Sequence, residues 1–370
     1  MSAEQNEGEI MEAMPKENVD AVKNKKATYE IQDQISKGSR GCIFQVLRLE
    51  DKKPLAMKCE ALKVKNALLK HEAKVYEALK SFYSPHFLSF EDRGVVEDRF
   101  TFIVLKLIGK NLADVQWKCP DRKFSLITAL HIGEQTLAAI RDLHFCGYIH
   151  RDIKPHNFAI GREEDKNYHT VYIIDFKFAR RFKTETKDLR LERAQAAFRG
   201  TPRYASITAL SMKEQSRKDD LESWWYMMVE LMIGRLPWAD LADQKKEQSR
   251  KDDLESWWYM MVELMIGRLP WADLADQKPY KLDDIKHVKK QIRLKNNLTK
   301  LLKATPEEYM TNIILYIDTL QYNSIPDYDY VAANLATSVK AYYLHKDAPP
   351  DWDLMAEYKG PRYEKTAVNA

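Results

Sequence analysis

The first hundred residues place apolar and polar side chains in short alternating stretches, which is the period of β-strands. Residues rich in glycine, serine and charge separate the stretches, as in Ser36-Lys37-Gly38-Ser39-Arg40-Gly41. The pattern predicts four strands, at 29–35, 42–49, 54–60 and 100–107.

Helical periodicity appears once within this part and again further along the chain. Residues 66–80 predict one helix, and residues 125–145 predict a long helix with Ser125 as its N-cap. Because strands come first and helices follow, we expect an α+β fold. Its parts are a small β-rich lobe with one main helix at 28–105 and a larger, mostly helical lobe at 106–345.

The two ends of the chain carry less information. Residues 1–27 are polar, mixed in charge and poor in large apolar side chains, so we expect them to be disordered. They contain no apolar stretch typical of a signal peptide. Residues 346–370 form a tail rich in proline and charge, in which we recognise no motif.

A perfect repeat interrupts the second half of the chain. Residues 213–245 recur without a change at 246–278. Structural repeats of this period come as three or more diverged copies that stack on each other. Two identical copies therefore indicate a recent duplication or an error in the gene model, and not a solenoid.

Composition excludes several classes of protein. In 370 residues, 45% are hydrophobic and 31% are charged, which is typical of a globular protein. The net charge of +4 gives no reason to expect a nucleic-acid partner, and no apolar run is long enough to span a membrane. Four cysteines without metal-binding spacing favour reduced thiols in a cytoplasmic or nuclear protein, which we expect to be monomeric.

Candidate chemistry is concentrated at 150–157, which reads His-Arg-Asp-Ile-Lys-Pro-His-Asn. Asp152 has Asn157 five residues later, and Asp175 follows in a second apolar run. Protein kinases use this arrangement: the first Asp accepts the proton of the substrate hydroxyl, and the Asn and second Asp hold the metal ions on ATP. Lys154 is the form found in serine/threonine kinases.

Weaker signals upstream agree with this interpretation. Gly38 and Gly41 would let backbone N–H groups approach phosphates, although a plain hairpin turn explains two glycines equally well. Lys58 follows in a predicted strand and matches the lysine that contacts the ATP phosphates. Glu72, fourteen residues later, could pair with it. Alone, Lys58 would be an ordinary edge-strand lysine and Glu72 a residue of a solvated helix face.

Asp175-Phe176-Lys177 departs from the usual kinase triplet, which has glycine in third place. A lysine adopts positive φ at a cost of about 1 kcal/mol or more, and it adds a cation near the phosphates. Two interpretations stay open: Lys177 is tolerated, or it leaves a weak or inactive enzyme.

The stretch 177–203 is strongly basic, with nine Lys or Arg against three acidic residues. As the segment on which a protein substrate lies, it would favour acidic or phosphorylated substrates. Arg180, Arg181 and Arg203 are the candidate anion site, and a solvated basic loop is the alternative. A second basic run, 281–303, is expected to form a solvated helix face.

Six further stretches complete the pattern: GKNLADV (109–115), GYIHRDIKPHNFAIGR (147–162), FRGTPRYAS (198–206), SRKDDLES (216–223), GRLPW (234–238) and PDYDY (326–330). The usual Ala-Pro-Glu motif is missing, and Arg-Tyr-Ala-Ser at 203–206 stands in its place. From about residue 28 to 345 the chain resembles the casein kinase I superfamily, and within it the tau-tubulin-kinase-like branch.

The resemblance implies a bilobal protein kinase that uses ATP and Mg²⁺ to phosphorylate serine or threonine in protein substrates. Asp152 would be the catalytic base, Lys154 a phosphate contact, and Asn157 and Asp175 the metal ligands. The positions that would contact ATP are Ile35, Gly38, Gly41, Ile43, Ala56, Lys58, Glu72, Leu105 (the gatekeeper) and Ile108 (the hinge). The departures from the family pattern are Ser36, Lys177 and His156.

The resemblance also gives the repeat a structural role, because its segment would form the central helix of the larger lobe. Asp220, or its copy Asp253, would brace the backbone of the catalytic loop. Leaving the apolar residues of the other copy exposed would forgo on the order of 10–20 kcal/mol, against a typical stability of about 5–15 kcal/mol. We expect the first copy to keep the site and the second to be an insertion before Pro279.

Three functions compete at this stage. The complete set of Lys58, Glu72, Asp152, Asn157 and Asp175 favours an active kinase. Lys177, Ser36 and the repeat favour a pseudokinase that binds phosphorylated partners. A small-molecule phosphotransferase is disfavoured by Lys154 and by the basic segment that suits a protein substrate.

Overall fold

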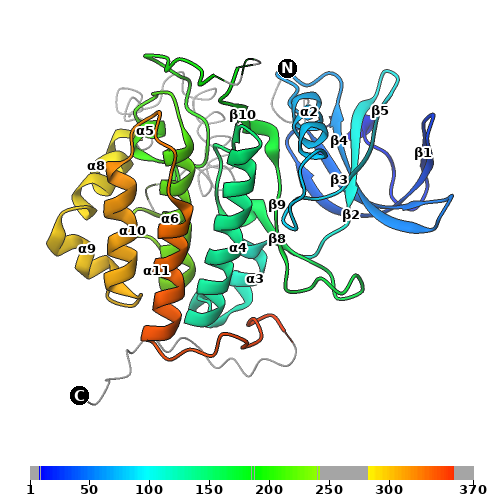
Figure 1. The fold of residues 1–370 in the computed structure, drawn as a ribbon. Coiled ribbons are helices and arrows are strands. Elements are labelled where there is room, and N and C mark those ends of the chain that lie inside the picture. Colours follow the sequence, from blue (N-terminus) through cyan, green and yellow to red (C-terminus); the bar gives the residue numbers. More distant parts are fainter. Residues whose placement is uncertain are drawn as a thin grey trace, which may run out of the picture. The chain divides into compact units, whose positions relative to one another are not determined.

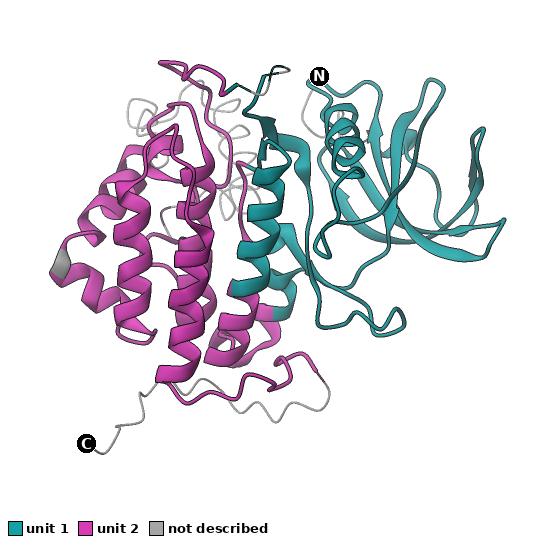
Figure 2. Ribbon diagram, viewed as in Figure 1, with its two compact units in different colours: residues 1–115, 134–150, 155–188 teal, residues 116–133, 151–154, 189–370 magenta. Residues whose placement is uncertain are grey.

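The computed structural model describes residues 8, 10–184, 186, 188–239, 241 and 282–353. They belong to two compact units, coloured separately in Figure 2: residues 1–115, 134–150 and 155–188, and residues 116–133, 151–154 and 189–370. This division differs from the expected boundary at residue 105, because two later segments fold with the N-terminal residues. The second copy of the repeat lies outside the described residues, and so do the predictions made for it.

The first unit is built on a six-stranded antiparallel sheet with the order β1-β2-β3-β4-β6-β5 (Figure 1). Its strands are β1 (Ala21–Lys23), β2 (Thr28–Gly38), β3 (Gly41–Arg48), β4 (Lys53–Ala61), β5 (Phe90–Val96) and β6 (Phe100–Lys106). The four predicted strands correspond to β2, β3, β4 and β6. Strand β5 escaped prediction because its sequence, FEDRGVV, carries three charged residues and a glycine.

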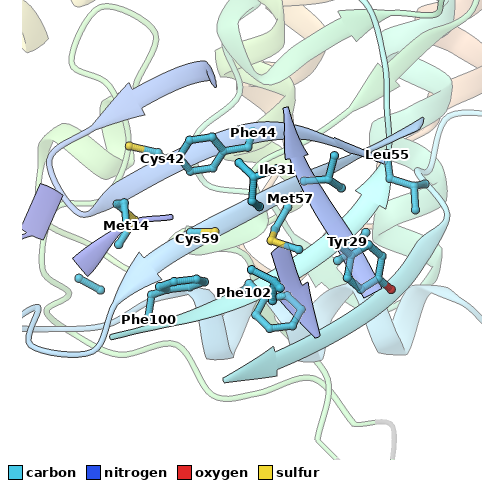
Figure 3. Packing of buried hydrophobic residues seen from close by; sticks show 14 of the residues in the cluster. Met14, Tyr29, Ile31, Cys42, Phe44, Leu55, Met57, Cys59, Phe100 and Phe102 are labelled. Carbon is cyan, nitrogen blue, oxygen red and sulfur yellow. The ribbon is translucent and has the colours of Figure 1, made fainter. Parts of the chain in front are cut away.

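Alternation along β4 divides the sheet into two faces with different roles. Leu55, Met57 and Cys59 are buried in a cluster that includes Phe44 and Phe102 (Figure 3). Residues between them on β4 point to the opposite face, because successive side chains of a strand alternate. Lys58 is therefore directed away from the apolar cluster.

The structure contradicts the predicted disorder of residues 1–27 from residue 10 onward. Ile10, Met14 and Val22 are buried in the same apolar cluster, and β1 pairs with β2. Arg99 donates hydrogen bonds to the carbonyls of Ala13 and Met14 and holds this segment against the sheet. A few apolar residues spaced along a polar segment are enough to order it when the sheet offers an uncovered apolar face.

The first unit also contains helix α2 (Leu69–Leu79), which contacts β5 and β6 and agrees with the helix predicted at 66–80. Its N-terminus has no side-chain cap of its own. Instead, the buried carboxylate of Glu60 at the end of β4 accepts hydrogen bonds from the backbone N–H groups of Leu68 and Leu69, at 2.8–3.1 Å. This cap joins β4 to α2, and its negative charge interacts favourably with the positive N-terminal end of the helix dipole.

Two short ribbons complete the first unit. β7 (Tyr148–Ile149) pairs with β10 (Arg180–Arg181), and β8 (Phe158–Ile160) pairs with β9 (Val171–Ile173). The 3₁₀ turns η2 (Pro155–Asn157) and η3 (Phe176–Phe178) lie at one end of the β8–β9 ribbon. There, the N–H of Ile174 donates to the carbonyl of Asn157 at 3.0 Å, which brings the segments of Asn157 and Asp175 together.

Helices α3 (Leu112–Lys118) and α4 (Leu126–Phe145) pass from one unit to the other. The second unit contains η1 (Pro120–Arg122), α5 (Ile207–Leu210), α6 (Arg217–Ile233), α8 (Leu282–Ile292), α9 (Lys295–Leu302), α10 (Glu307–Thr319) and α11 (Tyr328–Ala341). The predicted N-cap of α4 is confirmed, since the Ser125 hydroxyl accepts a hydrogen bond from the N–H of Thr128. The α+β class is confirmed as well.

The first copy of the repeat forms α6, the most deeply buried helix of the second unit, with α10 packed beside it (Figure 1). Ser216 and Asp219 form a capping box at its start, and Gly234 ends it with φ +86°. Trp224 and Trp225 are fully buried, and the indole N–H of Trp225 donates to the carbonyl of Met310. The first copy thus forms a buried central helix, as the resemblance implies for this segment.

The basic run at 281–303 forms α8 and α9, but it is not wholly a solvated face. Lys289 of α8 is fully buried, and its ammonium donates to the carbonyls of Pro202 and Ala205 while facing the rings of Tyr226 and Trp238. Carbonyl oxygens and aromatic faces both accept a buried cation, which sequence periodicity does not reveal.

None of the helices described is long and apolar enough to cross a membrane. All four cysteines lie in the described part of the chain, and none of them forms a disulfide.

Candidate active site

The first unit contains a pocket of about 470 Å³ between the β2–β3 hairpin, β4, α2 and the ends of the β8–β9 ribbon. This volume is within the range of ordinary small-molecule sites. All positions predicted to contact ATP or metal line it: Ile35, Gly38, Gly41, Ile43, Ala56, Lys58, Glu72, Leu105, Ile108, Asn157 and Asp175. Ser36, His156 and Lys177, the three departures from the family pattern, line it too.

Lys58 lines the pocket together with both of its acidic partners. Its ammonium donates to Glu72 Oε2 at 2.7 Å and to Asp175 Oδ1 at 2.9 Å. The alternation of β4 directs Lys58 toward the pocket, and the Glu60 cap fixes the helix that carries Glu72. The ion pair predicted from the sequence is therefore present.

Burial and charge act against each other in this cluster. Burial disfavours the ammonium of Lys58, but Asp175 and Glu72 outweigh that effect and raise its pKa. Burial likewise opposes ionisation of Asp175, yet Lys58 and Lys177 lower its pKa well below the ordinary value. Burial raises the pKa of Glu72, which is only 1% exposed. Lys58 and Asp175 are thus the firmly charged members.

Lys177 makes the second contact to Asp175. Its ammonium lies 2.5 Å from Asp175 Oδ2, so each carboxylate oxygen of Asp175 faces a lysine. The expected backbone cost is absent at this position: Lys177 lies in η3 without positive φ, and Asp175 itself has φ +68°. The argument that lysine strains the backbone here is therefore wrong for this conformation.

Packing around Phe176 fixes the direction in which Asp175 points. The buried Phe176 ring contacts Tyr76 of α2 and His150, with ring centroids 4.9 and 5.6 Å away. The His150 ring nitrogen Nε2 lies 3.0 Å from the carbonyl oxygen of Ile174, one residue before Asp175. Asp175 is therefore held from both sides while its carboxylate faces the pocket.

The glycine pair at the β2–β3 turn has a more local explanation than the one predicted. A Cβ atom at Gly41 would lie 2.0 Å from the carbonyl oxygen of Cys59, so the neighbouring strand β4 leaves room only for glycine. At Gly38 a Cβ would meet nothing closer than 3.6 Å. Gly41 is thus explained by sheet packing, and a role toward phosphates stays a prediction for both.

A second polar cluster, formed by Asp152, Lys154 and Thr201, lies in the second unit. The Thr201 hydroxyl donates to Asp152 Oδ1 at 2.8 Å and accepts from the Lys154 ammonium at 2.8 Å. Lys154 is also 3.0 Å from Asp152 Oδ2. Asp152 is only 4% exposed, so its carboxylate is held in one orientation.

Helix α6 supports this cluster through Asp220. The Asp220 carboxylate, only 2% exposed, accepts a hydrogen bond from the backbone N–H of Arg151 at 2.8 Å. Arg151 has φ +67°, an unusual conformation for a residue with a side chain. Gly200, with φ +121°, passes the Arg151 carbonyl so closely that its Cβ would be 3.0 Å away. The backbone beside Asp152 is therefore strained and held, as is common at functional sites.

The predicted anion site falls in two places. Arg180 and Arg181 form β10 in the first unit. Arg203 lies in the second unit, where its guanidinium pairs with Glu230 of α6 at 3.0 Å. Tyr204 donates to the same carboxylate. Because Glu230 balances its charge, Arg203 is less suited to an external anion than predicted.

The oxygen donors in the pocket fit a magnesium ion. Asp175 and Asn157 offer carboxylate and amide oxygens, the ligand types that Mg²⁺ prefers, and substrate phosphates usually supply others. Among the described residues no group of three or more His, Cys, Asp or Glu forms a metal site by itself. The donors fit, although Lys177 shares Asp175 with any metal ion.

Sequence reasoning missed several residues that shape the site. Thr201 stood inside a recognised motif, but nothing in the pattern assigned it a contact with Asp152. Glu60 read as the end of a strand, although it caps α2. Glu230 looked like one polar position of an apolar helix. Thr201 and Glu230 act on residues that are distant in the sequence, and Glu60 acts on backbone N–H groups of the next helix, so a residue pattern did not identify them.

The model of the protein kinase domain matches residues 29–317. A probable serine/threonine-protein kinase of Dictyostelium discoideum is 30% identical over 329 residues, which are 89% of this chain and 57% of the relative. The serine/threonine-protein kinase spe-6 of Caenorhabditis elegans is 41% identical over 191 residues, 51% of this chain and 49% of the relative.

A probable casein kinase I homolog of Encephalitozoon cuniculi is 30% identical over 320 residues, which are 86% of this chain and 91% of the relative. The chain covers only 49–63% of the length of the first three curated relatives that it matches.

Proposed function

The chain belongs to the protein kinase domain family, with homologues among serine/threonine kinases of the casein kinase I family, and from this premise we propose that it transfers the γ-phosphate of ATP to serine or threonine side chains of proteins. Its fold is that of a protein kinase, with an N-terminal antiparallel sheet and helix followed by a helical region. The observation that carries the proposal is the Lys58–Glu72–Asp175 cluster inside the pocket.

The pocket would bind the nucleotide. Ala56, Leu105 and Ile108 supply its apolar lining beside the hinge, and Lys58 offers an ammonium for the phosphates. Asn157 and Asp175 would hold Mg²⁺, which, when bound, neutralises the charge that develops on the transferred group.

Asp152 is proposed as the base that accepts the proton of the substrate hydroxyl. Its carboxylate is oriented by Thr201, and Lys154 at 3.0 Å would contact the transferring phosphate. The supporting hydrogen bond from Arg151 to Asp220 fixes the loop from which Asp152 projects. Positioning and charge, with little covalent chemistry from the protein, are what phosphoryl transfer requires.

The substrate class follows from the basic segment at 177–203. We propose acidic or phosphorylated protein segments, recognised through Arg180 and Arg181 more than through Arg203, because Glu230 already pairs with Arg203. The motifs quoted above, Arg-Tyr-Ala-Ser at 203–206 among them, support a place in the tau-tubulin-kinase-like branch.

A pseudokinase is the second candidate, and one observation favours it. Lys177 occupies a carboxylate oxygen of Asp175 that a metal ion would otherwise use. A scaffold of this kind would bind phosphorylated partners without transferring phosphate.

A phosphorylation assay separates the two functions. The full chain is incubated with radiolabelled ATP, Mg²⁺ and either an acidic serine peptide or its basic counterpart, with Asp152→Asn as the control. We expect label on serine, more on the acidic peptide, and none with the variant. Equal labelling of the peptide by the wild type and by Asp152→Asn would show that this chain is not the kinase that transfers the phosphate.

A further inference from the structure

The pocket carries more positive charge than its role with a metal-bound nucleotide requires. Its lining contains four basic side chains, Arg40, Lys58, Lys106 and Lys177, against the acidic Glu60, Glu72 and Asp175. Glu60 is directed at the N-terminus of α2, so it offers little to balance cations in the pocket. With glycine at position 177, as in the usual triplet, the excess would be smaller by one positive charge.

Lys177 places its charge at the carboxylate that would otherwise hold a metal ion. Its ammonium is 2.5 Å from Asp175 Oδ2, while Lys58 holds Oδ1 at 2.9 Å. The Lys177 side chain is 29% exposed and lines the pocket, so its ammonium stays accessible to a ligand that enters there. Lysine is a common phosphate ligand in nucleotide sites, where it acts as a point charge.

Because the Lys177 ammonium is attached to the chain, it can compete with Mg²⁺ from solution for the Asp175 carboxylate. A group held by a short tether acts at an effective concentration of roughly millimolar. Mg²⁺ has twice the charge but must lose water and come from solution. The turn η3 brings residue 177 back onto residue 175, and it does so without positive φ at Lys177.

We propose that Lys177 is a built-in cation that takes the place of one divalent metal ion, so that this pocket binds a nucleoside triphosphate without Mg²⁺. The proposal rests on the proposed function, since it assumes that the ligand of the pocket is ATP. It deepens that function by assigning a residue and an ionic requirement to nucleotide binding. Nucleotide binding forms and breaks no covalent bond, and Lys177 contributes only its positive charge.

The test measures binding, and not activity. The affinity of the full chain for a fluorescent ATP analogue is titrated in excess Mg²⁺ and again in EDTA, for the wild type, Lys177→Gly, Lys177→Met and Lys177→Arg. We expect the wild type and Lys177→Arg to bind with affinities that differ by less than about threefold between the two conditions. The Gly and Met variants should lose about tenfold or more in EDTA, or about 1.4 kcal/mol, and recover in Mg²⁺.

Lys63→Met, which removes an exposed lysine outside the pocket lining, is the matched control and should behave as the wild type. A wild type that binds only in Mg²⁺ would overturn the inference and leave the proposed kinase intact. A Lys177→Met variant that binds in EDTA as well as the wild type would overturn the assignment to Lys177. No binding in either condition would reject both the inference and the nucleotide site.

Discussion

The nucleotide-side cluster (Lys58, Glu72, Asp175 and Lys177) and the transfer cluster (Asp152, Lys154 and Thr201) are built differently. The first has four charged groups in contact, and one of them departs from the usual kinase residue. In the second, the Thr201 hydroxyl bridges the ion pair of Asp152 and Lys154. Its two predicted positions, Asp152 and Lys154, carry the residues usual in serine/threonine kinases.

The comparison teaches where a departure from the family pattern is tolerated. Lys177 adds charge where the phosphates and metal ion would bind, so we expect it to alter the ionic conditions of binding. The transfer cluster keeps the groups that we propose orient the substrate hydroxyl and accept its proton. We therefore expect binding requirements to have changed and chemistry to have been kept.

Removing the central lysine of the nucleotide-side cluster should have the largest effect on binding. Lys58→Met removes the ammonium that would contact the ATP phosphates and leaves the Glu72 and Asp175 carboxylates to repel them. Breaking such a buried pair also costs about 3–5 kcal/mol of folding stability. We expect more than a hundredfold loss of ATP affinity, measured by titration. Lys53→Met on the same strand breaks a more exposed ion pair with Glu91 and should change affinity less than about threefold.

Removing the support of the transfer cluster should slow turnover and spare binding. Asp220→Ala deletes the acceptor for the Arg151 N–H, and an unsatisfied buried donor costs roughly 1–3 kcal/mol. We expect kcat to fall by about ten- to hundredfold with unchanged ATP affinity. Asp220→Asn keeps an oxygen acceptor and should retain most of the rate; equal losses in both variants would contradict the role of this hydrogen bond.

The sequence predicted most of these parts and failed where distant segments meet. The catalytic loop, Lys58 and Glu72 were found because their spacing lies within one loop, or one strand and the following helix. The interval between Asn157 and Asp175 is the length of a β-hairpin, but which backbone groups of β8 and β9 pair was not predicted. The order of residues 10–27 was missed because only a few of their side chains enter the core.

Lys177 shows a second reason for failure. Its residue type suggested a backbone penalty, but the positive φ lies at Asp175, two residues earlier. A sequence gives the identity of a departure, whereas its effect depends on the conformation of the neighbouring residues. Lys289 was misplaced for a related reason, since only the fold supplies the carbonyls and rings that accept it.

The hydroxyl of Thr201 tests whether the transfer cluster works as a unit. Thr201→Val keeps the shape but removes the contacts to Asp152 and Lys154, at a net cost of about 1.4 kcal/mol, which is tenfold in rate. We expect kcat to fall about tenfold at constant KM for ATP. Thr201→Ser should restore the rate, and a Val variant with full activity would show that the hydroxyl is not used.

A smaller, pH-dependent effect should act through α6. Burial, together with Glu222, raises the pKa of the capping residue Asp219 to about 6, so the folded state keeps a proton that the unfolded state releases above about pH 4. The stability that this proton contributes is present below pH 4 and is lost as the pH rises toward 6. Asp219→Asn should remove that pH dependence, which amounts to about 3 kcal/mol. Urea unfolding at several pH values measures the free energy of unfolding of both proteins. If this free energy changed with pH in the same way in the wild type and the variant, the raised pKa of Asp219 would be contradicted.

The most direct test of the account measures binding and transfer on the same two proteins, the wild type and Asp152→Asn. ATP affinity is obtained by titration and phosphate transfer to an acidic serine peptide by radiolabel. The account predicts equal ATP affinities and a loss of transfer of about a thousandfold, the scale of general-base catalysis. Transfer that persists in the variant, or affinity that falls with it, would contradict the separation of the two clusters.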